Sequence, residues 1–114
     1  MYNFLIRQNL EESFGDALLE PTIAHHDVLI ARLKNGVTLE IRYPDTHEYS
    51  ILWRWDGAMS VIDTAPIHSD PASFPNHLHD ANGVVREDPL TDPAADPWDN
   101  VRAVLLAVLS DPKL

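Results

Sequence analysis

The chain has 114 residues, of which 45% are hydrophobic and 23% charged, which fits one globular domain over residues 1–114. Its net charge of −10 disfavours long-range attraction to nucleic acid and favours basic partners, and the absence of cysteine excludes disulfides and thiolate metal sites. Because no apolar run approaches the roughly 18 residues that span a bilayer and the N-terminal residues lack a signal-peptide pattern, we expect a cytoplasmic protein without a membrane span.

The N-terminal third changes from a helical to a strand-like pattern. Apolar residues recur at helical spacing between Leu10 and Glu20, which predicts one short helix that ends at Pro21. From Ile23 the apolar period is two, and the dipeptides Asn35-Gly36 and Asp56-Gly57 are typical of tight hairpin turns. The pattern predicts four strands, over residues 27–33, 37–43, 49–55 and 59–64.

The C-terminal part completes an α+β fold. A short fifth strand is expected over residues 84–87, and three consecutive hairpin-like links indicate an antiparallel meander, since parallel neighbours need long crossovers. Residues 88–96, rich in proline and aspartate, predict an exposed connector. Asp96 and Pro97 are typical of a helix start, with the aspartate as cap, and we expect this helix to run through Ser110 and cover one face of the sheet.

Two tryptophans, Trp53 and Trp55, share one face of the third predicted strand. An exposed pair could stack on nucleobases. Because the strand carries little basic charge beyond Arg54, the sequence favours packing of both rings in the core beneath the C-terminal helix.

Residues 63–79 are the first candidate for chemistry, because they hold three of the six histidines in a proline-rich segment that is poorly suited to a core. In an extended backbone, His77 and His79 project to the same side. A proline-containing bend could bring His68 back against them, and Asp63 or Asp70 could orient an imidazole.

Several chemistries fit these residues. Two imidazoles could act as base and acid on a phosphodiester, with Arg54 or Arg86 neutralising charge on the phosphate. The same histidines, with Asp63 or Asp70, could instead bind a metal, or they could only hydrogen-bond loop carbonyls. The sequence assigns no cofactor, and the nature of any metal stays unknown.

The remaining histidines are weaker candidates. His25 and His26 are adjacent, so on a strand they would face opposite sides and could not act as a pair without a bulge. His47 lies in a predicted turn beside Glu48, where we expect it to be solvated.

Three ordered motifs, over residues 49–55, 63–68 and 74–79, resemble the TumE-like family of prokaryotic toxin–antitoxin proteins. The resemblance covers about residues 27–87. It points to the residues Asp63, Pro66, His68, Phe74, Pro75, His77 and His79. Ile67 and Asn76 depart from the family pattern, which has histidine at both positions.

The resemblance implies the toxin of a toxin–antitoxin pair, with a helix-turn-helix antitoxin as partner. RNA is the substrate to test first, with His68, His77, His79, Asp63 and Arg54 as candidate catalytic residues in a ribonuclease or other phosphodiester hydrolase. A non-enzymatic acidic module that binds a basic partner is the alternative, favoured by the net charge. A free edge strand would also allow a homodimer.

Overall fold

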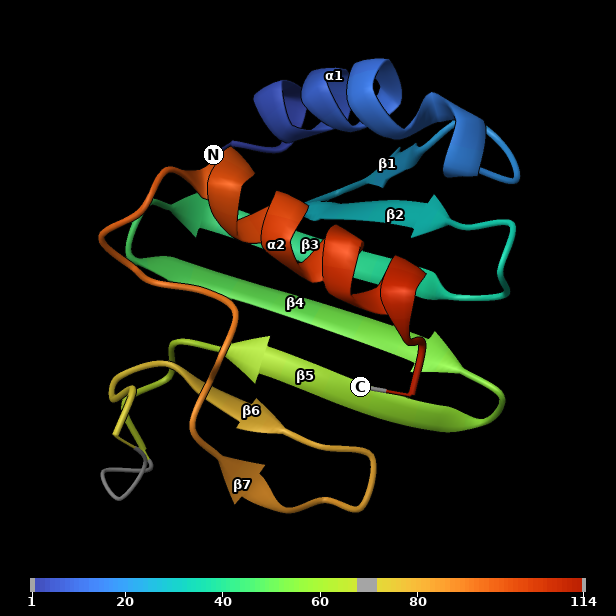
Figure 1. Cartoon of the computed structure of the whole chain (residues 1–114). Helices are drawn as coiled ribbons and strands as arrows, with labels where there is room; N and C mark the ends of the chain where they lie inside the picture. The colour runs from blue at the N-terminus through green and yellow to red at the C-terminus, as the bar shows by residue number, and fades with distance from the viewer. Residues whose placement is uncertain (1, 68–71, 114) are drawn as a thin grey trace.

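The computed structural model describes residues 2–67 and 72–113 and has an α+β fold (Figure 1). Helix α1 spans Asn3–Phe14 and is followed by the 3₁₀ turn η1, Gly15–Ala17, while helix α2 spans Pro97–Ser110. The strands are β1 Ile23–His25, β2 Val28–Arg32, β3 Thr38–Asp45, β4 Glu48–Trp55, β5 Ala58–Asp63, β6 His77–His79 and β7 Val85–Arg86. No helix among these described residues is long and apolar enough to cross a bilayer.

The sheet is an antiparallel meander with the strand order β1-β2-β3-β4-β5-β6-β7, as the hairpin-like links predicted. It has seven strands in the described part of the chain, so the expectation of about five was too low. The two strands that were missed, β1 and β6, are only three residues long. Such short segments carry too little alternation to identify a strand from sequence.

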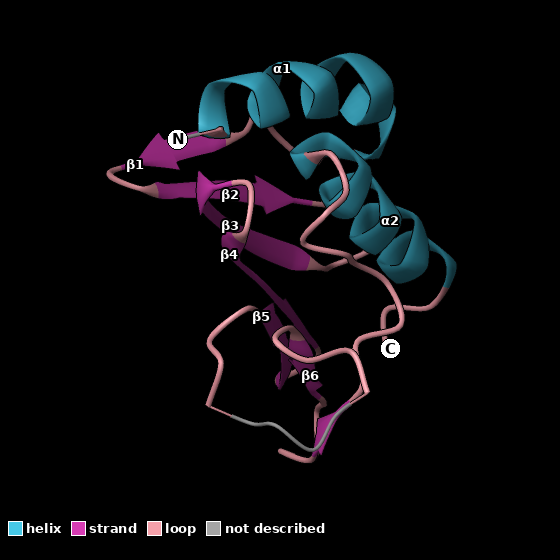
Figure 2. Ribbon diagram, turned by 90° about the vertical axis from the view of Figure 1, so that its left-hand side faces the viewer, coloured by secondary structure: helices cyan, strands magenta, loops and turns pink. Residues whose placement is uncertain are grey.

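The sheet and the two helices form two layers around one core (Figure 2). Both helices lie on the same face of the sheet, and α1 also packs against α2. The core takes alternate residues of the central strands, such as Ile51 and Trp53, together with Val104, Leu105 and Val108 of α2. Trp53 is fully buried, which confirms the predicted core position of this ring, whereas Trp55 is only partly buried and packs against the outside of the core. Within residues 2–67 and 72–113, no helix lies on the opposite face of the sheet.

The helix ends differ in part from the prediction. Helix α1 begins at Asn3, well before Leu10, and ends at Phe14, so the predicted end at Pro21 was wrong. The 3₁₀ turn η1 follows, and Leu18 is then extended, bridges to Leu33 and packs in the core. Helix α2 begins at Pro97 and ends at Ser110, as expected. Asp96 occupies the cap position, but its side chain makes no capping hydrogen bond, so that prediction was wrong.

The connector between β7 and α2 is also less exposed than predicted. Asp88 and Thr91 are buried, at 6% and 9% exposure, and Leu90 between them packs partly against the core, although Pro89, Asp92 and Ala94 are exposed. Composition misled here, because an aspartate and a threonine can be buried when hydrogen bonds satisfy their polar atoms.

The stacked rings of Tyr43 and Tyr49, 4.7 Å apart, give the fold a predicted weakness at alkaline pH. Burial raises the pKa of Tyr43 to about 12, against a partly opposing hydrogen bond from Asn100, and burial also raises the pKa of Tyr49. The folded protein favours the neutral phenols of both tyrosines. Their contribution to the free energy of unfolding is therefore complete below the ordinary tyrosine pKa of 10.0 and falls as the pH rises above it.

We therefore expect the free energy of unfolding to decrease between pH 10 and pH 12, and phenolate absorbance from these residues to develop above pH 10. Denaturant titrations across this range, combined with ultraviolet absorbance, test the expectation. Ionisation of both buried rings near pH 10 with no loss of stability would contradict it.

Candidate functional site

The last residue of β5 and the two ends of β6 form the candidate site. Antiparallel pairing sets Asp63 opposite His77 and Val61 opposite His79. Because side chains alternate along a strand, His77 and His79 project from β6 to the same face as Asp63, the face without helices. The sequence expectation that both imidazoles share one side is confirmed, although they lie on a strand and not in a loop.

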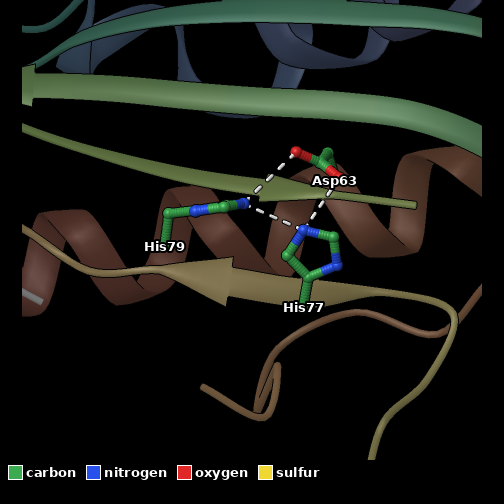
Figure 3. A group of neighbouring side chains, drawn as sticks. All are labelled: Asp63, His77 and His79. Atoms are coloured by element: carbon green, nitrogen blue, oxygen red, sulfur yellow. Dashed lines mark hydrogen bonds and ion pairs between the residues drawn. The ribbon is translucent and has the colours of Figure 1, made fainter. Parts of the chain in front are cut away.

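The polar atoms of the three side chains converge (Figure 3). His77 Nε2 lies 3.1 Å from Asp63 Oδ1 and 2.9 Å from His79 Nε2, while His79 Nε2 lies 3.8 Å from Asp63 Oδ2. The Ala65 amide donates a hydrogen bond of 3.0 Å to Asp63 Oδ1, which helps to orient the carboxylate. One ligand atom from each residue lies within 4.8 Å of the others.

The contacts of His77 are compatible with two neutral tautomers. A proton on Nδ1 would form a long hydrogen bond, 3.3 Å, to the carbonyl oxygen of Pro75, and Nε2 would then present its lone pair to Asp63 and His79. A proton on Nε2 would instead be donated to Asp63 Oδ1 at 3.1 Å or to His79 Nε2 at 2.9 Å. In the first tautomer, the lone pair and the carboxylate repel each other unless a positive charge lies between them.

Solvent reaches the cluster from two sides. The His77 side chain is fully buried, whereas those of His79 and Asp63 are 33% and 24% exposed. Asp63 and His79 line an open groove of about 490 Å³ that Asp80 also borders. Asp63 further borders a second hollow, of about 520 Å³, which contains Arg42 and Ser50. A molecule in either space could contact Asp63, but only the first space gives access to His79.

Sequence reasoning missed Arg42 and Ser50. The strand register places Arg42 opposite Ser50, Ser50 opposite Asp63, and Asp63 opposite His77, so the four residues form one row across β3 to β6. Arg42 has no ion-pair partner within the described chain. Because the Asp56-Gly57 turn fixes the register of β4 and β5, the pairing of Ser50 with Asp63 could have been predicted from the sequence. The pairing of Arg42 with Ser50 could not, because a bulge between Arg42 and Asp45 shifts the register of β3 and β4.

The two arginines considered from sequence lie elsewhere. Arg54 pairs with Glu40 and sits opposite Met59, four residues from Asp63 along β5, which corresponds to about 13 Å. Arg86 pairs with Asp80 at 3.4 Å and sits opposite Leu78, a core residue, so it belongs to the other face of the sheet. Neither arginine therefore joins the cluster.

The other histidines have separate environments. His68 and the neighbouring Asp70 lie outside the described residues. The rings of His25 and His26 are 4.3 Å apart, contrary to the expectation for adjacent strand residues, because β1 ends at His25 and His26 takes a turn conformation with a φ of 56°. His47 is exposed, as predicted, and donates a hydrogen bond of 2.8 Å from Nδ1 to the carbonyl of Pro93.

A buried polar network on the helix side fixes the start of β6. The Nδ2 group of Asn76 donates to Asp88 Oδ2 at 2.8 Å and to the carbonyl of Thr91 at 3.0 Å. Thr91 Oγ1 donates to Asp88, so the Tyr49 hydroxyl, 2.7 Å from Thr91 Oγ1, is the donor in that contact. Asn76 therefore anchors the strand from the face opposite His77, and an imidazole at position 76 would point away from the cluster.

No family model matches the chain, and no curated protein and no solved structure matches it either. The resemblance to the TumE-like family therefore stays a prediction.

Proposed function

We propose that the protein is the toxin of a prokaryotic toxin–antitoxin pair and that it cleaves RNA at the cluster of Asp63, His77 and His79. The convergence of these three side chains at a solvent-accessible edge is the observation that supports the proposal most. Arg42, which has no ion-pair partner within the described chain and borders the same carboxylate, supplies a cation for the phosphate. The toxin role itself follows from the sequence resemblance.

The different solvent exposures of the three side chains suggest different roles in catalysis. His79, the most exposed, takes the proton of the attacking ribose 2′-hydroxyl. As the bond from phosphorus to the 5′-oxygen breaks, the same imidazolium returns that proton to the leaving oxygen, which gives a 2′,3′-cyclic phosphate and a free 5′-hydroxyl. The buried His77 and the half-buried Asp63 position the His79 ring.

Arg42 would bind a neighbouring phosphate of the RNA. It lies in the second hollow, two strands from Asp63 along the row, which corresponds to about 10 Å between backbones, so an RNA strand that crosses the row could place one phosphate beside His79 and another beside Arg42. A charge-assisted hydrogen bond to a phosphate contributes about 1.5–3 kcal/mol.

The arginines of this sheet face give a matched test. We expect Arg42→Ala to slow cleavage of single-stranded RNA by at least about tenfold. Arg54→Ala, which removes an arginine already paired with Glu40, should cleave at the wild-type rate. Rates of product formation by the purified chain provide the measurement. Equal effects of the two substitutions would exclude Arg42 from the site, and absence of turnover by the intact chain would refute the RNA proposal.

A non-enzymatic module that binds a basic protein is the second candidate. It is favoured by the net charge of −10 and by a sheet face that no helix covers. Salt-sensitive co-purification with the product of the neighbouring gene, together with no RNA turnover by the isolated chain, would support this candidate over the first.

A further inference from the structure

The geometry points to a divalent transition-metal site, of the kind that binds Zn²⁺, formed by Asp63, His77 and His79. The inference rests on the proposed function and deepens it, because it concerns the same site and supplies the positive charge that cleavage of a phosphodiester requires. With an ion bound, His79 Nε2 would be a ligand, and a hydroxide ion on the metal would take the proton of the 2′-hydroxyl in place of His79. Two imidazoles and one carboxylate are a ligand set that suits zinc and its neighbours better than magnesium, which prefers oxygen ligands.

The separations between the polar atoms fit a common ion. Bonds of about 2.0–2.2 Å to nitrogen and oxygen place neighbouring ligand atoms roughly 3.0–3.5 Å apart. The two histidine Nε2 atoms are 2.9 Å apart, Asp63 Oδ1 lies 3.1 Å from His77 Nε2, and the other carboxylate oxygen, Oδ2, lies 3.8 Å from His79 Nε2. A small rotation of the Asp63 carboxylate, with a slight separation of the two imidazoles, would bring one oxygen and both nitrogens into one coordination sphere.

The surroundings of the ligands also fit. A histidine that binds a metal usually donates its other ring N–H to a carbonyl or carboxylate, which fixes the tautomer and directs the free lone pair at the ion. The contact of His77 Nδ1 with the Pro75 carbonyl has this arrangement, and the Ala65 amide holds Asp63 Oδ1 in a similar way. Both supporting contacts come from backbone groups that the fold itself positions.

The charge of the groove gives a functional reason for a metal. The described residues that line it include Asp63 and Asp80 but neither lysine nor arginine. A phosphate in this groove would therefore meet two carboxylates, of which Asp80 is paired with Arg86. A divalent cation at the cluster would make the local charge of the groove positive. Because the protein supplies only three ligands, one coordination position would remain for water or a phosphate oxygen.

A proton is the competing explanation for the close contacts. If His77 carries a proton on Nε2, either as one of its neutral tautomers or as an imidazolium, this N–H donates to Asp63 or His79, and no metal is needed. The two explanations differ in a measurable way, since only the metal site has a stoichiometric affinity for a transition metal that depends on Asp63.

Metal titration of the full chain tests the inference. After treatment with chelator, calorimetry should show one Zn²⁺ bound per chain, and Co²⁺ should produce visible absorption bands at the same stoichiometry. Asp63→Asn and His79→Gln should each weaken Zn²⁺ binding by at least about 100-fold, the upper end of the loss expected for a supporting contact alone. Excess Mg²⁺ should not displace Co²⁺.

The double variant His25→Gln/His26→Gln is the matched control, because it removes an exposed imidazole pair whose ring separation of 4.3 Å resembles the 4.7 Å of His77 and His79. We expect this variant to bind Zn²⁺ as the wild type does. The inference is overturned if the wild-type chain binds no metal, or if binding survives Asp63→Asn and His79→Gln but is lost in the control. Circular dichroism verifies that each variant is folded.

The same samples separate this inference from the proposed function. RNA cleavage by the metal-free chain at the full rate would overturn the role of the metal in cleavage and leave the ribonuclease proposal standing. Stoichiometric metal binding at these residues without RNA turnover would support the metal site and overturn the ribonuclease proposal.

Discussion

Replacing Asp88 with alanine is expected to lower the free energy of unfolding by about 3 kcal/mol. The buried carboxylate accepts hydrogen bonds from the amides of Leu90 and Thr91, from the Thr91 hydroxyl and from Asn76 Nδ2. Alanine would leave these donors short of acceptors in a region closed to water, and the penalty for such groups exceeds the strength of the bonds themselves. Equilibrium unfolding in urea measures the change.

Asp92→Ala is the matched control in the same connector. Asp92 is exposed, and its carboxylate accepts one hydrogen bond, 2.9 Å from the Ala94 amide, so its removal should change stability by no more than about 1 kcal/mol. Similar losses in the two variants would mean that the buried network does not stabilise the fold. A loss of stability in Asp88→Ala but not in Asp92→Ala would show that the connector holds the start of β6 in place.

Much of the sheet could be predicted because its central strands have one buried and one open face. In β4, Tyr49, Ile51 and Trp53 are buried while the residues between them are less so, and this alternation is visible in the sequence. The Asp56-Gly57 turn then fixes the pairing of β4 with β5. Local pattern and turn chemistry agree there, and the prediction was correct.

Prediction failed where tertiary contacts override local signals. Strand β6 lies in a segment rich in proline and histidine, and it is held by hydrogen bonds from Asn76 to Asp88 and Thr91, 12 and 15 residues later. The burial of Asp88 depends on the same long-range bonds. A single sequence does not reveal which connector will fold back over which strand.

The candidate site was predictable only in part for the same reason. The two-residue spacing of His77 and His79 predicted a shared face, but the pairing of His77 with Asp63 needs the β5–β6 register. Arg42 required a register shifted by a bulge, so sequence reasoning turned to Arg54, which is closer in the chain to Asp63 yet pairs with Glu40.

Under the proposed function, His79→Gln is expected to reduce RNA cleavage by at least about 100-fold and to abolish the growth inhibition expected when the chain is expressed alone. Glutamine keeps a polar side chain of similar reach but cannot exchange a proton near neutral pH. Because the His79 side chain is 33% exposed, the substitution should leave the fold intact. Cleavage rates, colony growth and far-ultraviolet circular dichroism measure the three effects.

His77→Gln should cause a comparable loss of activity even though the wild-type ring is fully buried, because His77 and Asp63 hold His79 in place. The control His25→Gln/His26→Gln, which alters an exposed pair on β1 and its turn, should remain toxic and active. Full toxicity of a folded His79→Gln variant would remove the cluster from the mechanism. If only the control variant lost toxicity, the active region would lie near β1, at the opposite edge of the sheet.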